Sequence, residues 1–125
     1  RQLPGLVAVL AGGLCGSAAR VGIGAWVPTP PAQFPTAIFL VNIIGSFLLG
    51  LYLARRERAT SARWSLQFWA IGVLGSFTTF SAFSLDVVQL LVEGQETTAL
   101  GYILSSTVGG LAVALLGQRV GEAVG

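Results

Sequence analysis

The residues best suited to chemistry gather in one short apolar segment, LGSFTTFSAFSLD, at positions 74–86. The segment combines three phenylalanines with a set of hydroxyl side chains: Ser76, Thr78, Thr79, Ser81 and Ser84. In a membrane helix, a Ser or Thr hydroxyl often bonds the carbonyl four residues earlier. This habit explains one or two of the hydroxyls well, and the whole set with difficulty.

The first half of the segment predicts a broken helix. Gly75, followed by the consecutive β-branched residues Thr78 and Thr79, makes a poor helix interior. We therefore expect a break at Gly75–Thr79. A break releases backbone carbonyls that lipid cannot satisfy, and a cation bound at a protected interface would be one way to satisfy them.

The second half of the segment places Phe80 and Phe83 on one helix face, with Asp86 three residues further along. Core packing also produces this spacing and stays the alternative. The edge of a phenyl ring carries partial positive charge. Two ring edges, hydroxyls and an amide N–H would form a neutral lining that suits a small anion, because no full charge would hold the ion too tightly.

Polar side chains also interrupt the other apolar runs. Arg20 either reaches the lipid headgroups or provides a fixed positive charge that attracts an anion to a vestibule. Asn42 either bonds a neighbouring helix or donates its N–H to a passing ligand. The last run contributes Tyr102, Ser105, Ser106 and Thr107.

The composition predicts a small all-α membrane protein with a single domain. Of its 125 residues, 54% are hydrophobic and 10% are charged, whereas soluble domains carry about 25% charged residues. Nucleic-acid binding is rejected, because the chain has no lysine and no basic face that also carries aromatic residues. With no histidine and one cysteine, Cys15, a transition-metal site is not expected.

Four apolar runs are long enough to cross a bilayer as helices, which takes about 20 residues. Their approximate bounds are 6–27, 36–54, 65–92 and 97–120. Four spans place both termini and the middle loop on one side, and these segments hold six arginines: Arg1, Arg55, Arg56, Arg58, Arg63 and Arg119. The loops on the other side hold none, so the positive-inside rule predicts cytoplasmic termini in the plasma membrane.

Three motifs in this order carry a family resemblance: GGLCGSAAR at 12–20, FLVNIIGSFLLG at 39–50 and GVLGSFTTFSAFS at 72–84. The chain resembles the Fluc (CrcB) family of fluoride channels over nearly its whole length. The resemblance implies passive export of cytoplasmic fluoride, which protects the cell from its toxicity. It also implies an inverted dimer, in which two subunits of opposite orientation form two fluoride pathways and hold a central structural sodium ion.

The resemblance further implies roles for single residues. The carbonyls of Gly75 and Thr78 would bind sodium, and the rings of Phe80 and Phe83 would face fluoride beside Asn42. The pathway would also include Thr79, Ser81, Tyr102 and Ser106, and the vestibules would include Arg20 and Asp86. Departures from the family pattern at Ala37, Ile38, Ala82 and Gly110 predict fewer polar side chains along the pathway than in some relatives.

The arginine bias supports a hypothesis about the partner. A chain that inserts in both orientations needs little bias, whereas this one places six arginines on one side and none in the opposite loops. We therefore expect either an obligate heterodimer with a homologous chain of opposite bias, as some family members form, or a homodimer of this chain.

Other functions fit the residues less well. A proton-coupled small multidrug exporter is also small, four-spanning and dimeric, but it needs a carboxylate in the first span, which here has Arg20 and no Asp or Glu. A non-transporting assembly subunit would not explain a broken, hydroxyl-rich helix. An enzyme is not expected, because Asp86 is the only carboxylate clearly inside a span and has no obvious partner.

Overall fold

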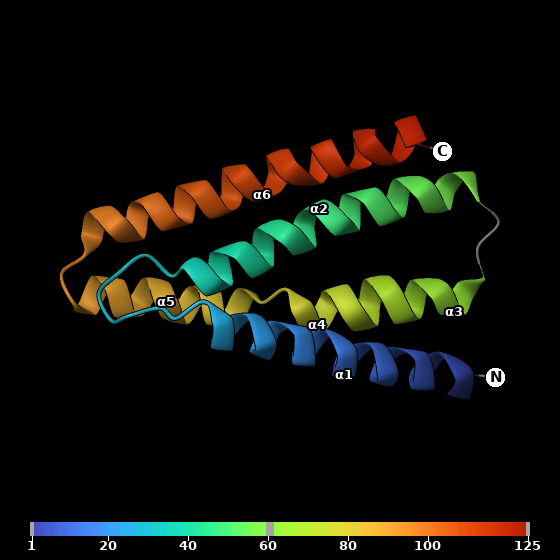
Figure 1. The fold of residues 1–125 in the computed structure, drawn as a ribbon, viewed down its shortest axis with the longest axis horizontal. Helices are drawn as coiled ribbons and strands as arrows, with labels where there is room; N and C mark the ends of the chain where they lie inside the picture. Colours follow the sequence, from blue (N-terminus) through green and yellow to red (C-terminus); the bar gives the residue numbers. More distant parts are fainter. Residues whose placement is uncertain (1, 60–61, 125) are drawn as a thin grey trace.

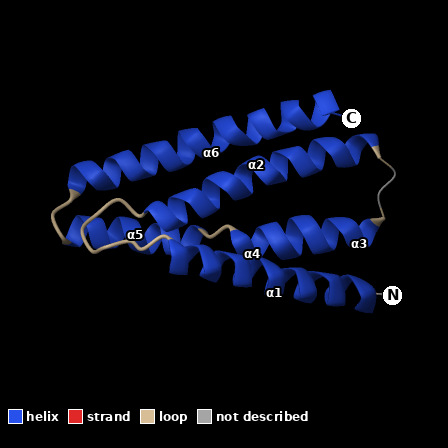
Figure 2. Ribbon diagram, viewed as in Figure 1, coloured by secondary structure: helices blue, strands red, loops and turns tan. Residues whose placement is uncertain are grey.

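A computed structural model describes residues 2–59 and 62–124, and within them the chain is entirely helical with short connections (Figures 1 and 2). Arg1 lies outside the described residues, so its part in the arginine bias rests on the sequence. Four stretches are long and apolar enough to cross a membrane: Leu3–Trp26, Thr36–Glu57, Arg63–Val92 and Glu96–Val124. The prediction of an all-α protein with four such helices is confirmed.

The first two spans are the helices α1 (Leu3–Trp26) and α2 (Thr36–Arg58). Pro4 stands in the first turn of α1, where a missing N–H removes no helical bond. A proline-rich segment at 28–35 separates the two helices, because clustered prolines cannot continue a helix. Both helices extend beyond the runs expected from hydropathy, at the start of α1 and at the end of α2.

The third span consists of several pieces. It begins with the short α3 (Arg63–Ser65), continues as the π-helix η1 (Leu66–Leu74) and α4 (Gly75–Phe77), and resumes after a break as α5 (Phe80–Val92). The break is shorter than predicted, because Gly75 has helical angles and only Thr78 and Thr79 are extended. The π-helix was not predicted from the sequence.

A tight turn joins α5 to the last span, α6 (Glu96–Val124). Gly94 has a φ of +74°, which a residue without Cβ adopts at little cost. The N–H of Gly94 donates to the Leu91 carbonyl, and the N–H of Gln95 donates to the Leu90 carbonyl at 2.8 Å. This Schellman motif ends α5 and reverses the chain.

The helices pack in two pairs: α2 lies along α6, and α1 lies along η1 and α4 (Figure 1). Glycines allow both close approaches. A Cβ at Gly117 would overlap the Phe47 carbonyl oxygen, and one at Gly16 would overlap the Val73 carbonyl oxygen. Small residues thus bring the backbones together, as is common where lipid surrounds the helices.

Few side chains are fully buried within the chain. Leu90, Ala99 and Tyr102 form a small cluster, whereas many large apolar side chains are exposed, including Leu14, Trp26 and Phe80. A surface this apolar is stable only when lipid or another protein covers it. The chain is therefore a multi-pass membrane protein.

Candidate functional site: a polar hollow beside the helix break

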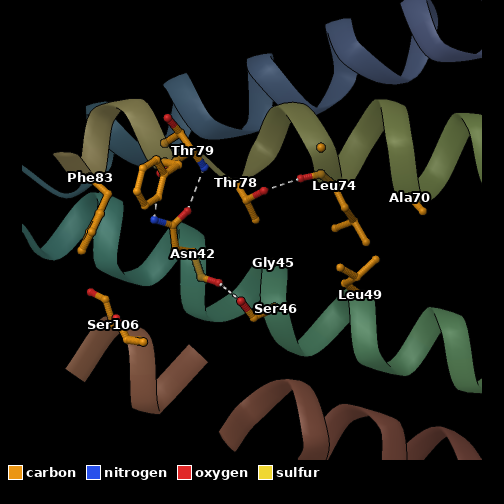
Figure 3. A pocket seen from close by; sticks show the side chains of 13 residues that line it. Asn42, Gly45, Ser46, Leu49, Ala70, Leu74, Thr78, Thr79, Phe83 and Ser106 are labelled. Atoms are coloured by element: carbon orange, nitrogen blue, oxygen red, sulfur yellow. Dashed lines mark hydrogen bonds between the residues drawn. The ribbon is translucent and has the colours of Figure 1, made fainter. Parts of the chain in front are cut away.

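Hydrogen bonds from threonine side chains close both ends of the break in the third span. At the end of α4, the N–H and Oγ1 of Thr78 both donate to the Leu74 carbonyl, at 3.1 and 2.8 Å (Figure 3). At the start of α5, Thr79 Oγ1 accepts from the Ala82 N–H at 3.1 Å and serves as the N-cap. An N-cap threonine satisfies one of the orphan donors of a helix start.

Asn42 on α2 connects its helix to the break. Its Nδ2 donates to the Thr79 carbonyl at 3.1 Å, and its Oδ1 accepts from the Thr79 N–H at 2.8 Å (Figure 3). The side-chain amide therefore replaces both helical partners that Thr79 lacks. Of the two interpretations drawn from the sequence, the structure shows the interhelical one, and Nδ2 carries a second hydrogen beyond this bond.

Arg20 on α1 reaches the break from the other side. Its Nε donates to the Ser76 carbonyl at 3.1 Å, and its side chain is partly buried. The sequence placed Arg20 in a vestibule or among the headgroups, and did not predict a bond to the third span. A role in attracting anions stays a prediction.

The carbonyls of Gly75 and Thr78 are left without a hydrogen-bond donor from the described residues. In an unbroken helix they would accept from the N–H groups of Thr79 and Ala82. Both donors bond side-chain oxygens instead, those of Asn42 and Thr79 respectively. The Phe77 carbonyl also has no donor among the described residues. The break thus leaves acceptors that neither the backbone nor lipid satisfies.

A hollow of about 390 Å³ lies beside the break, between α2, the third span and α6 (Figure 3). It brings together seven of the predicted site residues: Asn42, Gly75, Thr78, Thr79, Phe80, Phe83 and Ser106. Every lining side chain is uncharged. The hollow therefore combines hydroxyls, an amide and aromatic rings in a neutral surface.

Two details of this lining bear on ligand binding. The rings of Phe80 and Phe83 have centroids 5.8 Å apart, and Phe80 is 79% exposed. The Ser106 hydroxyl is buried and has no hydrogen-bond partner within the described part of the chain. A buried hydroxyl without a partner is costly, and it often marks a place where a ligand or water binds.

Four predicted site residues lie outside this hollow. Arg20 bonds the Ser76 carbonyl, as described above. Ser81 is exposed, and its Oγ lies 3.2 Å from the Oγ1 of Thr79, which does line the hollow. Tyr102 is fully buried and donates its hydroxyl to Asp86 Oδ2 at 3.1 Å. Asp86 itself lines a second hollow of about 270 Å³, between the end of α5 and the proline-rich loop.

The structure adds residues that the sequence reasoning did not assign to the site. Ser46 lines the hollow and donates to the Asn42 carbonyl at 2.7 Å, and Thr107 lines it from α6. Ser46 follows Asn42 by one helical turn, so the spacing N-x-x-x-S on one helix face was the available signal. Phe34, from the loop, packs edge-on against Tyr102 with ring centroids 5.3 Å apart.

Comparison with known proteins shows relatives that match the chain over most of its length. Residues 7–118 match the family model described as CrcB-like protein, Camphor Resistance (CrcB). A fluoride-specific ion channel FluC of Thermus thermophilus is 43% identical over 93% of this chain and 92% of its own length. Channels of the same name from Pseudomonas fluorescens and Gloeobacter violaceus are 44% and 40% identical, over 88% and 94% of this chain and 90% and 96% of their own lengths. The chain belongs to the CrcB (Fluc) family.

Proposed function

We propose that the chain forms a fluoride-selective channel through which cytoplasmic fluoride leaves the cell passively. The observation that carries the proposal is the uncharged hollow beside the helix break, lined by two phenyl rings, an amide and hydroxyls. The relatives are named as fluoride-specific ion channels, and none of those named here is an enzyme, in agreement with the sequence-based expectation.

The lining suits a small, strongly hydrated anion. The second N–H of Asn42, the hydroxyls of Thr79 and Ser106 and the ring edges of Phe80 and Phe83 offer only partial positive charge. Together they replace water around the ion, and the absence of a full charge lets it leave again. Ser81, beside Thr79, and Tyr102, one turn before Ser106 on α6, are proposed to continue this polar track.

The pathway is proposed to be completed by a second subunit of opposite orientation. Within one chain, Phe80 projects from the molecule with 79% of its surface exposed, although it stands at the centre of the proposed site. Aromatic side chains of this size are normally covered by protein or lipid. A partner that covers Phe80 would close the hollow, and a two-fold arrangement would give two such pathways.

A structural sodium ion is the cofactor that fits the break. The carbonyls of Gly75 and Thr78 are free of hydrogen bonds from the described residues, and both residues line one hollow. Carbonyl oxygens are suitable ligands for a hard cation. Bound there, the ion would satisfy both acceptors and stabilise the break, and a partner subunit would supply the remaining ligands.

The driving force requires no energy-coupling site. Hydrofluoric acid crosses membranes when the outside is acidic and ionises in a more neutral cytoplasm. A negative membrane potential then drives the anion outward through a passive pore. Arg20 and Asp86 are proposed to lie near the two vestibules, and the termini are proposed to face the cytoplasm.

The test is fluoride efflux from liposomes that contain the purified chain, measured with a fluoride electrode and with chloride as the control ion. We expect rapid fluoride release, lost in Phe83→Ile and kept in Phe68→Leu, since Phe68 packs on Trp69 away from the hollow. Release of chloride at a similar rate would contradict selectivity. If the chain alone releases no fluoride, and release appears when a homologous chain of opposite arginine bias is added, the channel is a heterodimer.

Proton-coupled drug export makes a different prediction in the same liposomes. It would show uptake of an organic cation driven by a pH gradient, together with little fluoride release. That result would replace the channel proposal with the exporter.

A further inference from the structure

We propose that Arg20 is a positioning residue for the cation site, because it holds the Ser76 carbonyl and so leaves the carbonyls of Gly75 and Thr78 to the ion. The inference rests on the proposed sodium site and extends it to α1, a helix that contributes no lining residue to the hollow. The guanidinium would then affect cation binding by holding the Ser76 carbonyl, in addition to attracting anions by its charge.

The contact between Arg20 and the break depends on a close helix approach. Gly16 lies one turn before Arg20 on the same face of α1. A Cβ at Gly16 would overlap both the Val73 carbonyl oxygen and the Ser76 hydroxyl. The missing side chain therefore lets α1 lie against the end of α4, where Arg20 Nε reaches the Ser76 carbonyl at 3.1 Å.

The hydrogen bonds around the break show why one carbonyl needs the arginine. In a continuous helix the Ser76 carbonyl would accept a hydrogen bond from the Phe80 N–H. Because Thr78 and Thr79 are extended, the Phe80 N–H is no longer in position to donate to it. The Ser76 hydroxyl is not a substitute, because it donates to the carbonyls of Gly72 and Val73, at 2.7 and 3.2 Å. Arg20 thus supplies the donor that the break removes.

The carbonyls on either side of the break differ in their hydrogen-bond donors. The Leu74 carbonyl is satisfied by Thr78, the Ser76 carbonyl by Arg20 and the Thr79 carbonyl by Asn42. The carbonyls of Gly75, Phe77 and Thr78 remain without a donor among the described residues, and those of Gly75 and Thr78 are the ones proposed to bind the ion. Without Arg20, the Ser76 carbonyl would compete for the ion or draw the end of α4 toward another donor, and either change would disturb the ligand set.

The proposal predicts the opposite sign from a purely electrostatic role. A fixed positive charge near a cation site weakens cation binding, so its removal would tighten sodium binding if charge were the only effect. A positioning residue has the reverse effect, because its removal loosens the site. The sign of the change in sodium affinity therefore distinguishes the two roles.

The experiment measures sodium-dependent thermal stabilisation of the purified, fully assembled protein in detergent, without fluoride, at constant ionic strength set by N-methylglucamine. The variants are Arg20→Leu, which removes donor and charge, and Arg20→Lys, which keeps the charge but replaces the planar donor. Arg119→Gln, an exposed arginine far along α6, is the charge control.

We expect the half-saturating sodium concentration to rise about tenfold in Arg20→Leu, which corresponds to about 1.4 kcal/mol, and to rise less in Arg20→Lys. Arg119→Gln should match the wild type. An unchanged or lower half-saturating concentration in both Arg20 variants would overturn the positioning role and leave the sodium site intact. If Arg20→Leu does not fold, the Arg20→Lys shift decides alone.

A wild-type protein that gains no stability from sodium would overturn the inference together with the cation site. Fluoride efflux, measured separately in liposomes, would show whether the channel proposal survives that result. Loss of the positioning role would show in the sodium affinity of the Arg20 variants, loss of the cation site in the wild-type sodium response, and loss of the channel function in fluoride efflux.

Discussion

Replacement of Asn42 by leucine tests the link between α2 and the broken span most directly. Leucine has a similar volume but cannot form the two bonds to Thr79, at 3.1 and 2.8 Å. Interhelical hydrogen bonds within membranes contribute about 0.6 kcal/mol each on average. A partly buried N–H or carbonyl left unsatisfied costs about 1–3 kcal/mol.

Two lost bonds therefore set a lower bound near 1 kcal/mol, and two unsatisfied groups raise the expected loss of stability to about 2–6 kcal/mol. The measurement is reversible unfolding in mixed micelles by a denaturing detergent, at fixed protein concentration. Asn42→Asp should lose less stability, because its carboxylate still accepts from the Thr79 N–H. It should nevertheless lose fluoride flux, because its negative charge repels the anion.

Ser46→Ala is the matched control for this series. Among the described residues, its hydroxyl bonds only the Asn42 carbonyl within its own helix, so the variant should unfold close to the wild type. Wild-type stability of Asn42→Leu would refute the reasoning, because it would mean that the two bonds to Thr79 make no net contribution.

Three further changes test other parts of the site. Gly16→Ala should destabilise the protein by about 1–3 kcal/mol, because its Cβ would overlap Val73 and Ser76, whereas Gly13→Ala, in open space, should not; equal unfolding midpoints would contradict the close approach. Thr79→Val should cost about 0.5–2 kcal/mol by removing the N-cap of α5, with Thr79→Ser as the control that keeps it. Ser106→Ala should leave unfolding unchanged or improve it, since its buried hydroxyl has no partner among the described residues, yet lower fluoride efflux; unaltered efflux would remove Ser106 from the pathway.

Much of the fold could be predicted from the sequence, because lipid restricts the choices. An apolar run in a bilayer must be helical, and the proline-rich segment at 28–35 has to interrupt it. The location of the break also followed from Thr78 and Thr79. The π-helix Leu66–Leu74 did not follow, because nothing in its sequence distinguishes it from an ordinary apolar helix.

The residues that line the hollow were easier to predict from the sequence than the hydrogen bonds that they form. Asn42, Phe83 and Ser106 line one hollow, and their role in conduction stays a prediction. The bond from Arg20 to the Ser76 carbonyl depends on how closely α1 approaches α4, and so does the choice of carbonyls left free. Such backbone partners are invisible in a side-chain pattern, because every residue carries the same backbone groups.

The pairing of helices also determines the order in which the protein can assemble. The partner of α1 is the third span and the partner of α2 is the fourth, so neither pair is formed by neighbours in the chain. As the chain is synthesised, α1 and α2 enter the membrane before either partner exists, and the face of α2 that packs on α6 has no helix against it until α6 arrives. The helix α6, in the last quarter of the chain, therefore completes the pair that α2 needs. A chain truncated before α6 would keep the pair of α1 with the third span and lose the pair of α2 with α6.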